Sequence, residues 1–188
     1  MRQGRRRMRG IGVAGVVALP LLLAGCGGGD TPSVVQAPCP RIAILADGAD
    51  LTRFRAGAPR DLTAMVVDAR ITGFDATCDF AGRDRGAVEV RITPRFEAER
   101  GPAAEGRSLD LPWFVAVSDP SDSVTLERIA ASSQVSFPAN VARAITTGRT
   151  VRLTVRAEEG TRIAEYPVRI AFQLTPDELA FNRQRGAR

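Results

Sequence analysis

Regular alternation of apolar and polar side chains is the feature that most constrains how this chain folds. Three segments show it, and apolar residues take nearly every second position of 88–96, 151–157 and 168–174. Successive strand residues point to opposite faces of a sheet, so each segment has one dry and one wet face. This pattern is typical of antiparallel sheets with one face in water. Pro94 interrupts the first segment and indicates a sheet edge or a bulge.

Further strand-like stretches and the turns between them indicate an all-β domain. The less regular stretches are 41–46, 51–55, 62–71, 74–80, 113–118, 123–130 and 135–137, and turn-forming clusters lie at 46–48, 82–86, 119–122 and 158–160. About eight short strands with such turns predict an antiparallel β-sandwich of immunoglobulin-like type. It resembles antibody domains in architecture alone, because Trp113 follows both Cys39 and Cys78 instead of lying between them.

Two segments of the chain have helical patterns. Residues 140–147 contain a short Val-Ala-Arg-Ala-Ile run, which predicts one or two helical turns. At the C-terminus, Thr175 as N-cap, a proline at the first position and Glu178 at N3 form a capping box. We expect this helix to span 176–185 and to pack Leu179 against the sandwich; a docking helix for a partner is the alternative.

The N-terminus reads as an export signal. Five arginines lie within the first nine residues, an apolar run occupies 11–24, and small residues follow, which is the pattern of a secretory signal peptide. Fourteen helical residues cover about 21 Å, whereas a hydrocarbon core is about 30 Å thick. The segment is therefore too short for a permanent transmembrane helix.

The end of this signal, Leu23-Ala24-Gly25-Cys26, resembles the lipobox of bacterial lipoproteins. The resemblance implies cleavage before Cys26 and attachment of acyl chains, palmitate among them, to this cysteine, so that lipid holds the protein at a membrane. It divides the chain into a signal peptide (1–25), a lipidated cysteine with a flexible tether (26–38) and a β-sandwich domain (39–188). Gly27 follows Cys26 where an Asp would retain a lipoprotein in the inner membrane, which implies the outer membrane.

Lipidation of Cys26 leaves Cys39 and Cys78 as a pair in an oxidising compartment. A disulfide between them closes a loop that stabilises the fold by about 4 kcal/mol in a chain-entropy model. A two-cysteine metal site is the rival, but no further Cys or His lies nearby to complete it.

The absence of His and Lys removes most catalytic chemistry. Without them there is no imidazole base, no Ser-His-Asp system and no Schiff base. Asp47 with Asp50, and Asp119 with Asp122, offer oxygen ligands for Ca²⁺, although aspartates in turns usually accept backbone hydrogen bonds. We therefore expect no catalytic residues, no resident metal and no cofactor.

The net charge of +5 belongs to the leader. Of the 26 basic residues, all arginine, five lie in the first nine positions, and the 21 that follow equal the 21 acidic residues. On the predicted strands, arginines alternate with glutamates, which indicates a solvated face with cross-strand ion pairs. A near-neutral mature protein gives no footprint for nucleic acid.

These observations predict a structural or protein-interaction module on the periplasmic side of the outer membrane. Its partner would be another envelope protein, bound at an exposed strand edge or a loop end. The alternative is a binding module for a small anionic ligand or an envelope polysaccharide. A free edge or broad apolar patch favours the first, and a pocket of convergent arginines favours the second.

Overall fold

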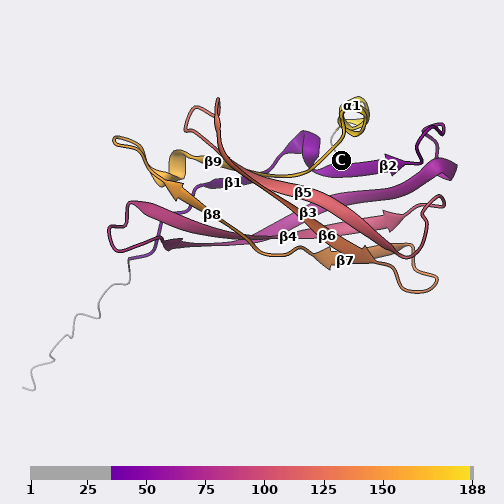
Figure 1. The fold of residues 1–188 in the computed structure, drawn as a ribbon, viewed down its shortest axis with the longest axis horizontal. Coiled ribbons are helices and arrows are strands. Elements are labelled where there is room, and N and C mark those ends of the chain that lie inside the picture. The colour runs from indigo at the N-terminus through magenta and orange to yellow at the C-terminus, as the bar shows by residue number, and fades with distance from the viewer. Residues whose placement is uncertain (1–34, 187–188) are drawn as a thin grey trace, which may run out of the picture. The chain divides into compact units, whose positions relative to one another are not determined.

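Two packed β-sheets form the domain in the computed structural model, which describes residues 35–186 (Figure 1). Sheet A has the order β1 (Arg41–Ile44), β9 (Pro167–Phe172), β5 (Ser108–Ser118), β6 (Thr125–Ser136). Sheet B has the order β2 (Asp50–Phe54), β3 (Met65–Phe80), β4 (Ala87–Arg100), and both β7 (Arg143–Thr147) and β8 (Val151–Arg156) pair with β4. One α-helix, α1 (Pro176–Arg185), and three short 3₁₀ helices, η1 (Ala46–Gly48), η2 (Leu62–Ala64) and η3 (Ile163–Glu165), complete the described elements.

The dry faces predicted from the alternation meet between the two sheets. Val88, Val90 and Ile92 of β4 are fully buried, and alternate residues of β8 and β9 join the same core. Trp113 of β5 is also fully buried, and its indole Nε1 donates a hydrogen bond to Ser133 Oγ at 2.9 Å. The expectation of an all-β sandwich is confirmed at this level.

One strand pair departs from the antiparallel prediction. β1 runs parallel to β9, with Arg41 opposite Pro167, so sheet A is mixed. After β1 the chain crosses to sheet B through η1, and a Cβ on Gly48 would lie 2.6 Å from the Cβ of Ala171. A glycine therefore permits this close crossing. Alternation within a strand carries no information about the direction of a partner so distant in sequence.

The helix predicted over 140–147 is wrong, because residues 143–147 form β7. β7 pairs antiparallel with residues 95–99 of β4, with Ala144 opposite Ala98. The Val-Ala-Arg-Ala-Ile run has only weak local preferences. Pairing with the long strand β4 satisfies its backbone and outweighs them.

Pro94 lies inside sheet B instead of at an edge. β7 and β8 meet β4 on the same side, and the chain between them passes Pro94, where the amide of Gly148 donates to the Pro94 carbonyl at 2.8 Å. A proline donates no ladder hydrogen bond, so the neighbouring strand can break there. The pair of β3 and β4 does contain a bulge, but it lies in β3 between Ile71 and Gly73, opposite Arg95 and Phe96, and not at Pro94, which pairs with Phe74.

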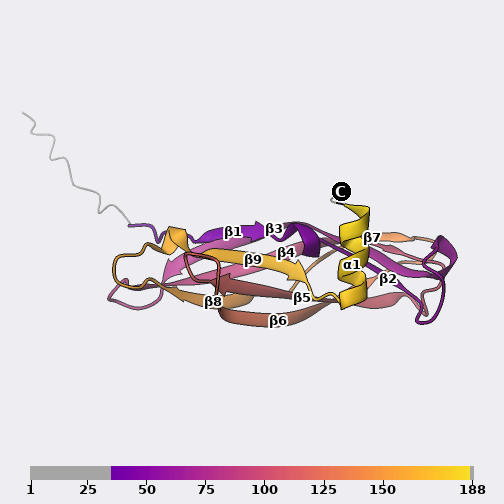
Figure 2. The same ribbon diagram turned by 90° about the horizontal axis from the view of Figure 1, so that it is seen from above.

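α1 spans the predicted residues and has the predicted capping box. Thr175 Oγ1 accepts from the amide of Glu178 at 3.2 Å, and the carboxylate of Glu178 accepts from the amide of Thr175 at 2.8 Å. Figures 1 and 2 show the helix across the strands, above the edge that carries β2. Leu179 is only half-buried, whereas Glu178 and Asn182 are buried, so polar side chains dominate this packing. No helix of residues 35–186 is long and apolar enough to cross a membrane.

Candidate functional site

The predicted cysteines have different outcomes. Cys26, the predicted lipidation site, lies outside the described residues. Cys39 and Cys78 form the predicted disulfide, with 5.6 Å between their Cα atoms. The bond joins the segment before β1 to the last part of β3, and so links the two sheets near the start of the domain.

Asp47 and Asp50, the first candidate pair for Ca²⁺, are engaged by arginines. Asp47 Oδ2 accepts from Arg183 Nε at 2.8 Å, and Asp50 lies 3.1 Å from Arg70 Nε and 3.5 Å from Arg185 Nη2. Guanidinium groups at these distances repel a cation. The pair thus helps to fasten α1 to the domain.

Asp119 and Asp122, the second candidate pair, shape the loop between β5 and β6. Asp119 accepts from the Ser121 hydroxyl and from the amides of Ser123 and Val124 at 2.8 and 2.6 Å. The Ser121 hydroxyl first, and then these amides, lower the pKa of Asp119 to about 2. Asp122 pairs with Arg169 at 2.8 Å. Among residues 35–186, no group of three or more Cys, Asp or Glu is placed to hold a metal ion.

β6 forms a free edge of sheet A in the described domain. This twelve-residue strand is the last of sheet A and has β5 as its one strand partner there. On its other side, the carbonyl of Ala130 accepts from Arg149 Nη2 at 3.3 Å, and that of Gln134 from Thr146 Oγ1 at 3.4 Å. Because a strand directs alternate residues to alternate sides, the amides and carbonyls of residues 128, 130, 132 and 134 point away from β5.

The sequence of this edge lacks the usual protection against strand addition. Residues 129–136 read Ile-Ala-Ala-Ser-Ser-Gln-Val-Ser, without a charge or a proline. Exposed edges commonly carry charged side chains, prolines or covering segments that prevent pairing with another chain. The side chains of Ala130 and Ser132 are exposed and small, so they leave the backbone accessible. Val124 and Leu126, at the start of β6, expose more than half of their surface.

Other edges of the described sheets are short or covered. α1 covers β2, where Asn182 Nδ2 donates to the carbonyls of Asp50 at 2.7 Å and Asp47 at 3.0 Å. β1 has four residues, and the side formed by β7 and β8 is interrupted at Pro94. The part of β3 that extends past β2 carries two charged residues, Asp75 and Asp79. We define the backbone edge of residues 128–134 as the β6 edge.

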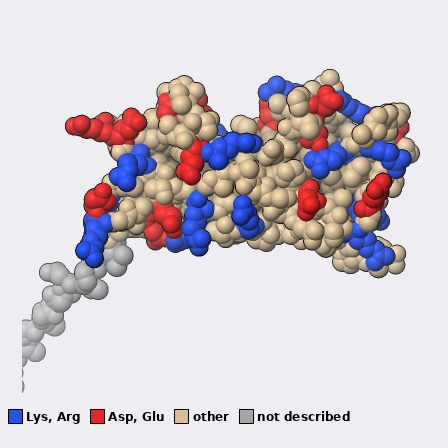
Figure 3. Space-filling model, viewed as in Figure 1, with Lys and Arg blue, Asp and Glu red and all other residues tan. Residues whose placement is uncertain are grey.

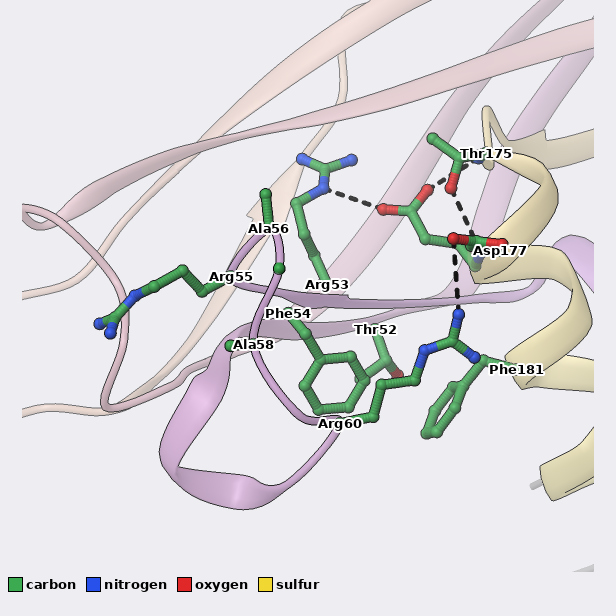
Figure 4. Close-up of a pocket in the computed structure, with 12 residues that line it drawn as sticks. Thr52, Arg53, Phe54, Arg55, Ala56, Ala58, Arg60, Thr175, Asp177 and Phe181 are labelled. Atoms are coloured by element: carbon green, nitrogen blue, oxygen red, sulfur yellow. Dashed lines mark hydrogen bonds and ion pairs between the residues drawn. The ribbon is translucent and has the colours of Figure 1, made fainter.

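A pocket of about 450 Å³ lies between α1 and the end of β2 (Figure 4). Three arginines line it, but their guanidinium groups do not converge. Arg53 pairs with Glu178 at 2.9 Å, Arg60 lies 3.6 Å from Asp177, and Figure 4 shows Arg55 directed away from both. Two of the three positive charges are thus already matched by carboxylates.

The outer face of sheet B carries cross-strand ion pairs, as the alternation of arginine with acidic residues indicated. Arg95 pairs with Asp75 at 2.5 Å, and Arg143 pairs with Glu99 at 3.0 Å. Arg91 forms ion pairs with Asp79 and Glu89. Figure 3 shows positive and negative residues interspersed on the face in view. This mixture provides no extended field of one sign.

No family model, curated protein or solved structure matches this chain. Its function must therefore be inferred from its own residues.

Two features of the site were missed by the sequence analysis. The strand over 123–130 was predicted to end there, whereas β6 continues to Ser136, and its place at the end of a sheet was not foreseen. The uncharged run of residues 129–136 was a usable signal for an accessible strand. Arg149, which caps the edge, lies in a turn between two strands and gave no signal.

Proposed function

We propose that this protein is a lipid-anchored interaction module of the cell envelope, which binds another envelope protein by strand addition to the β6 edge. The observation that supports it is a long strand at the end of sheet A, uncharged over 129–136, whose outward backbone groups make just two hydrogen bonds with side chains of residues 35–186. Addition of an extended segment to such an edge supplies main-chain hydrogen bonds, and neighbouring side chains supply specificity.

The anchoring part of the proposal rests on the lipobox and its flanks. In this proposal residues 1–25 are the signal peptide, Cys26 carries acyl chains, and residues 27–38 connect it to the domain. Two or three acyl chains hold a protein stably at a membrane, whereas one chain binds reversibly. With Gly27 after the lipidated cysteine, the proposed location is the periplasmic face of the outer membrane.

We further propose that the protein has no enzymatic activity and needs no cofactor. The complete lack of His and Lys supports this, because general base and nucleophile systems depend on these residues most often. The immunoglobulin-like class also remains part of the proposal. Its support is a pair of packed sheets around the buried Trp113.

Site-specific crosslinking in intact cells tests the interaction. A photoreactive residue replaces Ser132 on the β6 edge, and in a matched control it replaces Thr77, which is exposed on β3. We expect an envelope protein to be captured from position 132 and not from position 77. Capture at neither position above background, or equal capture at both, contradicts the proposal.

Metabolic labelling tests the anchor. Cells fed with labelled palmitate should incorporate the label into the wild-type protein and not into Cys26→Ser, while Cys39→Ser keeps it. Fractionation of the envelope should place the labelled protein in the outer membrane. An unlabelled wild-type protein would remove the lipoprotein part of the proposal and leave the binding part intact.

The second candidate function, binding of a small anionic ligand or polysaccharide, has the pocket below α1 in its favour. Two of its three arginines, Arg53 and Arg60, already pair with Glu178 and Asp177, so an anion that binds these two must displace carboxylates. This makes it the weaker candidate.

A further inference from the structure

We infer that the strand bound at the β6 edge carries an acidic side chain, which pairs with Arg149. This inference rests on the proposed function and names the chemistry of the partner. When the edge is unoccupied, Arg149 donates a hydrogen bond to the backbone of β6. Once a strand has taken that backbone position, the guanidinium of Arg149 is free to bind a side chain of the new strand.

The side chain of Arg149 lies beside the β6 edge, where the next strand of sheet A would pair. It lies in the interruption between β7 and β8, where Gly148 bonds to Pro94, and it reaches across to sheet A. Its Nη2 donates to the Ala130 carbonyl at 3.3 Å, which is long for a hydrogen bond from a charged donor. A strand that pairs with β6 needs this carbonyl for its own amide, so Arg149 must release it.

Release leaves a guanidinium group without a matching charge. Arg149 is an exposed residue, and within residues 35–186 no ion pair joins its guanidinium to a carboxylate. A guanidinium has five N–H donors in a planar fork that fits a carboxylate with two parallel hydrogen bonds. An Asp or Glu on the incoming strand, on its face toward sheet B, would meet that fork.

Arg128, the other arginine beside the edge, is placed differently. It belongs to β6 itself, and its guanidinium lies over the ring of Phe114 at 4.1 Å, on the outer face of sheet A. This stacking holds the side chain away from the path of an added strand. Arg128 therefore serves as a matched control for Arg149.

The rest of the edge defines the other features of the segment. Ile129 and Ala131 are half-buried and face sheet B, so an added strand can extend the core with apolar side chains at alternate positions. Ala130 and Ser132 offer outward backbone groups for hydrogen bonding, and their small side chains lie on the outer face of sheet A, where they leave room for an added strand. The expected partner segment is extended, alternates apolar and polar residues, and has one acid next to Arg149.

A second copy of this chain fits the edge less well. Two β6 strands paired antiparallel would bring two Arg149 side chains to one interface. Glu127 is the single acid on each β6, and it lies outside the uncharged run. A different partner with a carboxylate balances the charge, whereas a homodimer leaves both guanidiniums unmatched.

Peptide selection tests the inference. The probe is a phage-displayed library of random peptides of about 10 residues, the length of a long strand, panned against the full exported protein purified in detergent. We expect selected peptides with alternating apolar residues and an Asp or Glu at one shared position. Changing this acid to its amide should weaken binding about 5-fold or more, as expected for loss of a charge-assisted pair.

Variants of the protein separate the possible results. Arg149→Gln should cause the same loss as the amide peptide, with no further loss when both changes are combined, and Arg128→Gln should leave affinity unchanged. Ser132→Pro should abolish binding of every selected peptide, because it removes an outward amide, and Ser132→Ala should not. Circular dichroism checks that Ser132→Pro remains folded.

Neutral selected peptides, or full affinity in Arg149→Gln, would overturn the acidic-partner inference while the strand-addition proposal survives through Ser132→Pro. Peptides that still bind Ser132→Pro, or a library that yields no binders, would overturn both. Self-association that Ser132→Pro abolishes would identify a second copy as the partner and also overturn the inference.

Discussion

The buried indole of Trp113 depends on one hydroxyl group, that of Ser133. Ser133→Ala removes the acceptor at 2.9 Å from Nε1 and leaves a buried donor unsatisfied. We expect the free energy of unfolding to fall by about 1–3 kcal/mol. Urea denaturation measures it, and Ser136→Ala, at an exposed serine on the same strand, serves as the control. Equal effects of the two substitutions would show that the buried hydrogen bond adds nothing.

The carboxylate of Asp119 makes the loop between β5 and β6 sensitive to acid. Its pKa is lowered to about 2 from 3.8, first by the Ser121 hydroxyl and then by backbone amides. A lowered pKa in the folded state stabilises the loop fully above the unfolded value, and the contribution disappears as the pH falls through about 2.

We expect amide exchange at Val124 to stay slow at pH 4 and to accelerate as the pH approaches 2, relative to amides of the core strands. Asp119→Ala should give fast exchange at Val124 already at neutral pH. Unchanged protection in this variant would show that the carboxylate does not hold the loop.

At the level of elements, the sequence was informative where local pattern and tertiary context agreed. The alternating segments at 88–96, 151–157 and 168–174 all became strands that contribute to the core, and the capping box marked the start of α1. Where the local pattern was ambiguous, the neighbouring strands determined the structure. The run at 140–147 has a composition compatible with a helix, yet residues 143–147 pair with the side of β4 that β3 leaves free and form β7.

α1 covers the edge of β2 mainly with polar contacts. Asn182 donates to two backbone carbonyls of the segment that enters β2, at 2.7 and 3.0 Å. Asn182→Ala removes the donor to the buried carbonyl of Asp50 and the part-buried carbonyl of Asp47, so we expect a loss of about 1–3 kcal/mol in unfolding free energy and faster amide exchange in the helix. Gln184→Ala, at an exposed position of α1, is the control. The same protection in both variants would contradict this role.

The disulfide between Cys39 and Cys78 encloses β1, β2 and most of β3. With a sequence separation of 39 between the cysteines, the chain-entropy model predicts about 4 kcal/mol of stabilisation. We expect the double variant Cys39→Ser/Cys78→Ser to lose an amount of this order in urea denaturation. Reductant should destabilise the wild-type protein and leave the double variant unchanged. A double variant as stable as the wild type would show that the disulfide does not stabilise the fold.

At the scale of the whole molecule, the order of the strands in the two sheets could not be predicted from the sequence. A strand's own residues show its faces, but its neighbours depend on pairings such as that of Arg41 with Pro167. The β6 edge could not be predicted for this reason, since an edge is defined by the absence of a neighbour. The disulfide was predictable because the sequence leaves one possible pair, Cys39 and Cys78, once Cys26 is assigned to the predicted lipobox.

The charge composition predicts an unusual pH profile. With no His or Lys, and with Cys39 and Cys78 bonded, few groups titrate between about pH 6 and 9. Proton uptake by the folded and unfolded states is then nearly equal, so we expect the free energy of unfolding to be constant across this range. Urea denaturation at several pH values measures it, and a steep slope near neutral pH would contradict it.

The position of the disulfide determines how the domain bears a mechanical load. With the lipid anchor proposed at Cys26, tension from the membrane would enter at the residues before β1, and β1 has only four residues paired with β9. Cys39 passes this tension through a covalent bond to Cys78 on β3, a sixteen-residue strand inside sheet B. Such a force would therefore bypass β1, the shortest described strand, and spread over the ladder between β3 and β4.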